Sequence, residues 1–157
     1  MCCQQSKNYL SIYTNDTVDK KMYHLYNGRR REVVKMEIVD LIVKRLHETI
    51  ENGKLGLDYT FDCGRKKNKS FDREYNVQIS QKVKILLKLK REHYVKSEES
   101  KNEEHVNDTV HIFKIKEKLM PRYDELADYR LVCIYIKVTW PEGKEPMFII
   151  SFHEDEE

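Results

Sequence analysis

The chain has 157 residues, of which 36% are charged, well above the ~25% of an average soluble protein. Its hydrophobic residues (39%) come in periodic blocks, so we expect one folded domain over residues 1–157 rather than a disordered chain. No apolar run approaches the ~20 residues of a membrane span, so no transmembrane segment is expected. The formal net charge of +2 hides a segregation: residues 1–94 hold 20 basic and 12 acidic residues, and residues 95–157 hold 9 and 15.

The residues before position 29 predict a flexible start and two short strands. Residues 1–8 indicate a frayed terminus, and residues 9–14 alternate between apolar and polar side chains, as a half-buried strand does. Residues 18–26 are a second strand candidate, with alternate side chains on one side. Asn27-Gly28 then supplies a strong turn signal.

A long amphipathic helix is predicted between about Arg31 and Glu51. Its apolar residues recur at helical spacing, namely Val34, Ile38, Leu41, Ile42, Leu46 and Ile50. An apolar stripe this wide is expected to pack across a sheet. Asn52-Gly53 supplies the C-terminal stop.

After this helix the hydrophobic period changes from 3.6 to 2. Residues 55–63 predict a strand, and the basic residues 64–70 predict a connecting loop. Residues 76–94 alternate aliphatic side chains with lysines, which predicts a strand with one apolar and one cationic face. The same residues also fit helical spacing, and that alternative stays open. Residues 95–108 have almost no apolar content and predict an exposed, mobile acidic loop.

The C-terminal part of the chain predicts three further strands. Alternation resumes over residues 109–119, and residues 129–140 are the most apolar stretch and therefore the expected centre of the sheet. Residues 141–146 (PEGKEP) predict a hairpin loop before a last strand over residues 147–153. Residues 154–157 form an acidic tail.

The predicted fold class is α+β, with one long helix packed on a curled antiparallel sheet of about five to six strands. Antiparallel pairing is expected because no second helix is available for a parallel crossover. This order resembles the cystatin-like roll, in which a meandering sheet wraps a helix, and the Trp140-Pro141 loop resembles the aromatic-proline hairpin of cystatins with the two residues reversed. The resemblance is one of topology and implies a fold only, because the Gln-x-Val-x-Gly hairpin of the cystatin inhibitors is absent.

The cysteines favour a reducing compartment, so we expect a cytoplasmic or other intracellular protein. The inner pair, Cys63 and Cys133, is widely separated and no C-x-x-C is present, which argues against a disulfide framework. Cys133 is expected to be a small core residue. Cys2 and Cys3 could carry acyl chains in a eukaryotic host, but their neighbours are neither basic nor amphipathic, so lipid anchoring is not expected.

Motifs for catalysis, metals and cofactors are not found. The sequence has no glycine-rich phosphate loop, no H-E-x-x-H and no G-x-S-x-G. His93, His105 and His111 are spaced more widely than zinc ligands usually are. Cys63 precedes a basic loop, but no partner histidine can be identified for it. We therefore predict no catalytic residue, no metal and no cofactor; whether the chain is an enzyme stays uncertain, and the non-enzymatic interpretation is favoured.

Three basic clusters are the candidate contact residues. They are Arg29, Arg30 and Arg31; Arg65, Lys66, Lys67 and Lys69; and Lys82, Lys84, Lys88 and Lys90. If the third cluster is extended, its lysines repeat about every 7 Å on one face, a spacing comparable to that of phosphates along a nucleic-acid strand. The alternative is an ordinary solvated face whose lysines keep the sheet soluble.

Three functions are considered from these features. The first is a small non-enzymatic interaction protein that binds a macromolecular partner, foremost a protein, as inhibitors, immunity proteins and viral or mobile-element accessory factors do. The second is a nucleic-acid-binding protein that uses the basic sheet face, and it requires residues 82–90 to be extended. The third is a small hydrolase or nuclease with unrecognised residues. The oligomeric state is not predicted.

Overall fold

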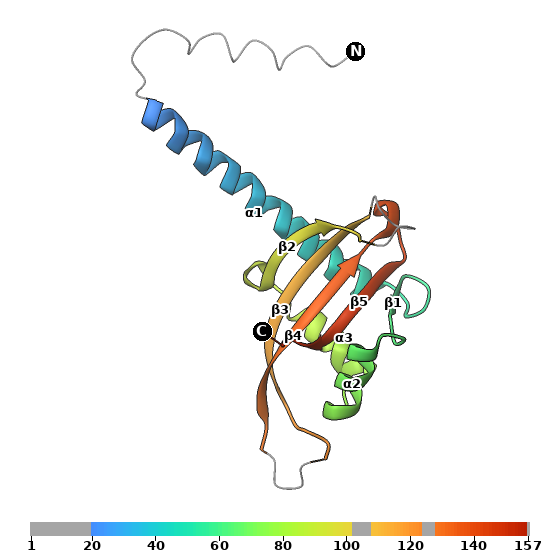
Figure 1. Cartoon of the computed structure of the whole chain (residues 1–157). Helices are drawn as coiled ribbons and strands as arrows, with labels where there is room; N and C mark the ends of the chain where they lie inside the picture. The colour runs from blue at the N-terminus through green and yellow to red at the C-terminus, as the bar shows by residue number, and fades with distance from the viewer. Residues whose placement is uncertain (1–19, 102–107, 124–127, 157) are drawn as a thin grey trace. The chain divides into compact units, whose positions relative to one another are not determined.

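The computed structural model describes residues 20–101, 108–123 and 128–156 (Figure 1), with only the backbone for residues 20–31, Val34 and Glu142. Its helices are α1 (Lys20–Asn52), α2 (Lys66–Tyr75), α3 (Ile79–Leu87) and the short 3-10 helices η1 (Arg91–His93) and η3 (Pro141–Gly143). Its strands are β1 (Tyr59–Phe61), β2 (Tyr94–Glu99), β3 (Thr109–Leu119), β4 (Arg130–Thr139) and β5 (Met147–Glu154). The α+β prediction is confirmed.

Contacts within the chain divide it into residues 1–37 and residues 38–157. The first unit contributes the backbone of α1 up to Glu37, and the second holds residues 38–52 of α1 together with all five strands. The prediction of a single domain stays a prediction. None of the helices that the structure describes is both long enough and apolar enough to cross a lipid bilayer.

The five strands form one mixed sheet with the order β1-β5-β4-β3-β2. β4 is the central strand, as predicted, and β3 has the predicted bounds. The all-antiparallel prediction is wrong at one edge, because β1 pairs with β5 in parallel. The chain between β1 and β5 contains α2 and α3 as well as three strands, and this long connection returns the chain in the same direction.

The second correction concerns residues 64–70, which were expected to form a loop. They belong largely to α2, whose buried residues Asn68, Phe71 and Tyr75 lie three and four positions apart. Most of the remaining side chains are charged or polar, and they hide this narrow apolar stripe in the sequence. The helix ends at Asn76, whose φ of 48° places it in the left-handed region that Asn tolerates better than most residues.

The third correction is the most consequential, because residues 76–94 were expected to form a strand. Residues 79–87 form α3, so the helical alternative is the right one. Ile85, Leu86 and Leu89 are buried in the core, which is the spacing of one helix face. The backbone N–H of Gln78 donates to the side chain of Gln81 at 2.8 Å. Gln81 thus caps the N-terminus of α3 as the third helical residue of a capping box, in which Gln78 occupies the N-cap position where serine or threonine is usual.

The long helix starts earlier than predicted, and it stops where predicted. It begins at Lys20, so neither the strand over residues 18–26 nor the turn at Asn27-Gly28 is present. Met22 and Tyr26 lie four positions apart, so the few points that suggested alternation also fit a helix. At the other end the N–H of Gly53 donates to the carbonyl of Thr49 at 3.0 Å, and a Cβ at Gly53 would clash with that carbonyl oxygen.

Two of the predicted polar segments are partly ordered. Part of the expected loop over residues 95–108 forms β2, which pairs antiparallel with β3. β5 continues to Glu154, and the N–H of Asp155 donates to the carbonyl of Cys133 at 2.8 Å. The predictions for residues 1–8, the strand over 9–14, Cys2 and Cys3, residues 102–107 and Glu157 lie outside the described residues.

The core lies on one face of the sheet, where α3, α2 and the C-terminal part of α1 pack. Asn68 of α2 fixes β5 to this arrangement. Its amide donates to the carbonyls of Asp62 (2.6 Å) and Ile150 (3.1 Å) and accepts from the N–H of Phe152 (3.0 Å). The pairing of β5 with β4 shifts by one residue at this point. One buried amide thus satisfies two backbone groups of β5 next to the bulge.

Candidate binding face

The sheet has one face that the helices cover and one that we call the open face. Along β3 and β4 one alternate set of side chains joins the core cluster with residues of the helices, and the other set points away. Figure 1 shows α3 behind the strands, so the open face is turned toward the viewer. By register, its residues are Lys96 and Glu98 on β2; Val110, Ile112, Lys114, Lys116 and Lys118 on β3; Leu131, Cys133, Tyr135, Lys137 and Thr139 on β4; and Phe148, Ser151 and His153 on β5.

A carboxylate held by two lysines occupies the β2 side of the open face. Glu98 lies 2.9 Å from the ammonium of Lys96 and 3.1 Å from that of Lys137. Hydrogen bonds from Lys96 and then Lys137 lower the pKa of Glu98 to about 2. The carboxylate is therefore ionised throughout the neutral range, and it neutralises part of the positive charge of its two neighbours.

The ring of Tyr135 lies at the middle of the open face. The ammonium groups of Lys114 and Lys137 lie 5.9 and 5.6 Å from its centroid, within the range of cation–π attraction. The ring of His153 on β5 is 5.5 Å away at an interplanar angle of 31°. Two neighbouring rings flanked by cations thus lie on the sheet surface.

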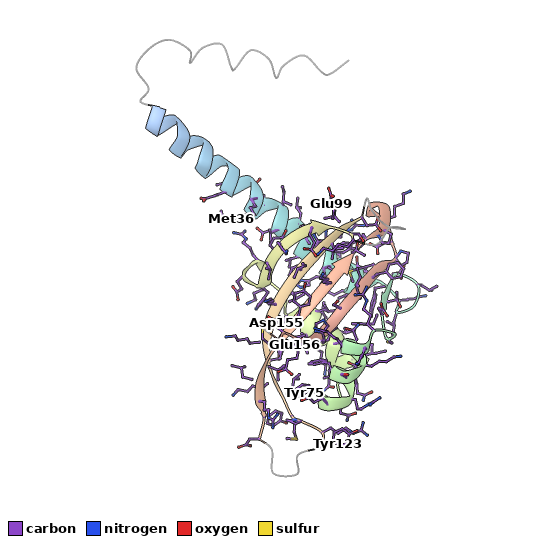
Figure 2. All side chains as sticks on the ribbon, viewed as in Figure 1. Met36, Tyr75, Glu99, Tyr123, Asp155 and Glu156 are labelled. Atoms are coloured by element: carbon purple, nitrogen blue, oxygen red, sulfur yellow. The ribbon has the colours of Figure 1, made fainter. Side chains whose placement is uncertain are left out.

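Asp155, the residue after β5, adds a second carboxylate to the open face. Asp155, labelled in Figure 2, places its carboxylate 2.6 Å from the ammonium of Lys114 and 3.8 Å from the sulfur of Cys133. Burial and then the charge of Asp155 raise the pKa of the Cys133 thiol. Cys133 is half-buried on the open face and not in the core where it was predicted. A thiol with a raised pKa is a poor nucleophile at neutral pH.

A cleft of about 650 Å³ lies between residues of β2, β4 and β5 and the segment that follows β1. Glu98, Lys137 and Phe148 line it from the open face, and Asp62 and Arg65 line it from the opposite rim. The guanidinium of Arg65 lies 3.0 Å from the carboxylate of Asp62. Charges of both signs therefore line the cleft together with an exposed aromatic ring.

The other end of β3 carries two lysines that form no ion pair with any residue the structure describes. β2 pairs with β3 only between Thr109 and Phe113, so beyond that point β3 has a described partner strand on its β4 side alone. Lys116 and Lys118 are exposed there, and within the described residues neither side chain makes a hydrogen bond or an ion pair. Among the described residues of the open face, Lys116 and Lys118 are thus two exposed cations without an ion pair.

The first two predicted basic clusters do not lie on the open face strands. Residues 29–31 fall inside α1, which begins at Lys20; their side chains are outside the described residues. Lys66, Lys67 and Lys69 are on α2, where Lys67 forms an ion pair with Glu156 at 2.8 Å. Arg65 alone of this set lines the cleft.

The third predicted cluster is dispersed by the helical conformation of α3. Only 3% of the Lys82 side chain is exposed; its ammonium pairs with Asp72 at 2.6 Å and lies 5.5 and 5.4 Å from the ring centroids of Phe61 and Phe152. Lys88 pairs with Glu117 at 2.8 Å. Lys84 and Lys90 are exposed. The predicted lysine ladder over residues 82–90 does not exist.

The open-face lysines were missed, although the sequence contains a signal for them. Lys114, Lys116 and Lys118 alternate with core residues in β3, and the strand over residues 109–119 was predicted with its correct bounds. Extending the alternation to the end of that strand places all three on one face. Lys96 and Lys137 join them only through the strand register, which the sequence does not specify.

A serine and a histidine are hydrogen-bonded across β2 and β3, on the covered side of the sheet. The hydroxyl of Ser97 lies 2.6 Å from Nδ1 of His111 and 2.7 Å from the hydroxyl of Tyr94. Burial and then the charge of Arg45 lower the pKa of His111. A histidine that activates a serine must accept a proton and become a cation, which these two influences oppose.

Neither a search for metal-binding side chains nor a comparison with known proteins assigns a function to this face. In the part of the chain that the structure describes, no three His, Cys, Asp or Glu side chains are grouped in a way that could hold a metal ion. Comparison with protein-family models, with curated proteins and with solved structures finds no significant match to this chain.

Proposed function

We propose that this chain is a non-enzymatic interaction protein that binds a macromolecular partner through the open face of its sheet. The observation that carries the proposal is the asymmetry of the sheet: helices supply the core on one face, while the other keeps lysines, rings and a cleft of about 650 Å³. Leu131 and Phe148 on this face are 64% and 37% exposed. Exposed apolar side chains among charged ones are typical of interaction surfaces.

The ionisable groups support binding over catalysis. A general acid or base works best when its pKa lies near the working pH. On the open face the pKa of Glu98 is lowered to about 2 and that of the Cys133 thiol is raised. Both shifts move these groups away from the neutral range. Ion pairs with Lys96 and Lys137 hold the Glu98 carboxylate in place, an arrangement that suits recognition of a partner.

A reducing compartment completes the proposal. Cys63 is exposed and Cys133 is half-buried, and both are free thiols. Persistent free thiols are typical of proteins that work inside the cell. We therefore place the protein in the cytoplasm or another reducing compartment, and expect its folding to be unaffected by thiol reductants.

The test selects ligands for the full chain from two random libraries, one of peptides and one of single-stranded nucleic acids. Each enriched ligand is then measured against Leu131→Asp/Phe148→Ser on the open face. The control is Leu57→Asp/Ile79→Ser, because both residues are exposed and lie outside the open face. Binding is expected to fall about tenfold or more with the first variant and to stay within about twofold with the control.

Two results contradict the proposed function. One is that neither library yields a ligand for the folded chain. The other is that the enriched ligands tolerate the open-face variant as well as they tolerate the control. Enrichment from either library with selective loss on the open-face variant supports it.

A further inference from the structure

We propose that the partner of the open face is a single-stranded nucleic acid, whose phosphates lie along Lys114, Lys116 and Lys118 of β3 and whose bases lie on the rings of Tyr135 and His153. This inference rests on the proposed function and names its partner class. Three features of the open face carry it: the spacing of the lysines, the lack of an ion pair at Lys116 and Lys118 within the described residues, and the rings next to them.

The lysines form a row with a regular spacing. They occupy alternate positions of β3, so their side chains leave the backbone about 7 Å apart on the same face of the sheet. A single strand of nucleic acid is a flexible chain with one negative charge per nucleotide, and it can adjust to such a row. Proteins that bind single strands commonly follow the backbone with a positively charged surface of this kind.

Within the described residues, two lysines of the row, Lys116 and Lys118, make no ion pair, whereas Lys114 is paired with Asp155 at 2.6 Å. In register across from Lys118, Lys116 and Lys114 on β4 are Leu131, Cys133 and Tyr135, none of which is a carboxylate. On the other side β3 passes beyond the end of its pairing with β2. The row thus runs along a sheet edge, where an extended partner can approach it.

The rings favour nucleic acid over an acidic peptide. The rings of Tyr135 and His153 lie next to each other with their planes tilted by 31°, and the ammonium groups of Lys114 and Lys137 lie within 6 Å of the Tyr135 centroid. Each base of a nucleic acid has a π-face that stacks on such rings, with a contribution of about 1–3 kcal/mol per base. An extended acidic peptide matches the lysines equally well but brings no ring of its own with every charge.

Asp155 acts as an internal competitor for the row. Its carboxylate holds the ammonium of Lys114 at 2.6 Å, and both side chains are largely buried. A phosphate that binds Lys114 has to displace this carboxylate. Removing its charge with Asp155→Asn should therefore tighten binding by about twofold to fivefold, the expected gain from one partly screened charge.

The experiment measures the anisotropy of a fluorescein-labelled single-stranded oligothymidine as the full chain is added. The row variant is Lys116→Glu/Lys118→Glu. The control, Lys84→Glu/Lys90→Glu, makes the same change in net charge at exposed positions in and just after α3, the helix that packs on the covered side. Circular dichroism checks that both variants are folded, and a labelled polyglutamate of similar length is titrated in parallel.

The wild-type chain is expected to bind the oligothymidine, with an affinity that falls roughly ten- to twentyfold between about 50 and 200 mM salt for three phosphate contacts. The row variant should lose about tenfold or more at low salt, the control less than about threefold, and Asp155→Asn should gain. Equal losses in row variant and control overturn the inference, since net charge alone would then explain binding. Binding of polyglutamate without oligothymidine overturns it too. A peptide selected on the open face, with no oligothymidine binding, refutes this inference while the proposed function stands.

Discussion

Two stretches of this chain carry lysines at every second position, and the fold uses them in opposite ways. In α3, residues two apart point roughly 200° apart around the helix; Lys82 is therefore buried against Asp72, while Lys84 is exposed. In β3 the same spacing puts Lys116 and Lys118 on one open face. The contrast teaches that a lysine row is a property of the secondary structure and not of the spacing alone.

Removing the buried lysine should have the largest effect on stability. Lys82→Ala deletes the ion pair with Asp72 and leaves a space between the rings of Phe61 and Phe152. We expect the free energy of unfolding to fall by about 3 kcal/mol, as for other buried pairs that lose one partner. Urea denaturation followed by circular dichroism measures it.

The matched control is Lys84→Ala, two positions along the same helix and exposed. Its effect should stay within about 0.5 kcal/mol. Similar losses for the two variants would mean that α3 does not orient these lysines as described.

The pair of lysines around Glu98 should produce a smaller, pH-dependent effect. Because the folded-state pKa of Glu98 is about 2 and its ordinary value is 4.5, the ionised carboxylate stabilises the fold fully above about pH 4.5. That contribution is lost as the pH falls from 4.5 toward 2. Glu98→Gln has no charge to lose, so its stability should fall by about 1 kcal/mol less than that of wild type over this range. Parallel pH profiles of the two proteins would refute the assignment.

The exposed pair on the covered side should have the smallest effect. Lys88 and Glu117 lie 2.8 Å apart, and 56% of the lysine side chain is exposed. Surface pairs of this kind contribute about 0.5 kcal/mol. A double-mutant cycle of Lys88→Ala and Glu117→Ala measures that coupling, and a coupling above about 1.5 kcal/mol would show that the pair is not a surface pair.

Sequence patterns predicted the strands better than the helices. β3 and β4 alternate over most of their length, β5 does so on either side of one bulge, and the order of the three strands along the chain left little choice of partners. Residues 79–87 carry aliphatic side chains that fit the spacing of a strand as well as that of a helix. Only the burial of the adjacent residues Ile85 and Leu86 in the structure distinguishes the two. Once α3 was taken for a strand, the long connection that makes β1 parallel to β5 was also lost.

The candidate site could not be located from the sequence. The basic sheet face predicted over residues 82–90 is wrong because residues 79–87 form α3, and the lysines of the proposed binding face belong to β3 and β4 instead. Lys114, Lys116 and Lys118 follow from the alternation of a correctly predicted strand. Glu98 and Asp155 approach the same face through strand register and through the turn of the chain after β5, which no local pattern specifies.

The most direct test of the account is an amide-resolved NMR titration of the full chain with single-stranded oligothymidine. Shifts should concentrate on residues 114–118 of β3 and residues 131–137 of β4, and they should weaken as salt is raised. Amides of α2 and α3 should shift no more than they do when the same oligothymidine is added to the Lys116→Glu/Lys118→Glu variant. Shifts confined to α2 and α3, with β3 and β4 unchanged, would contradict the claim that the open face of the sheet is the binding surface.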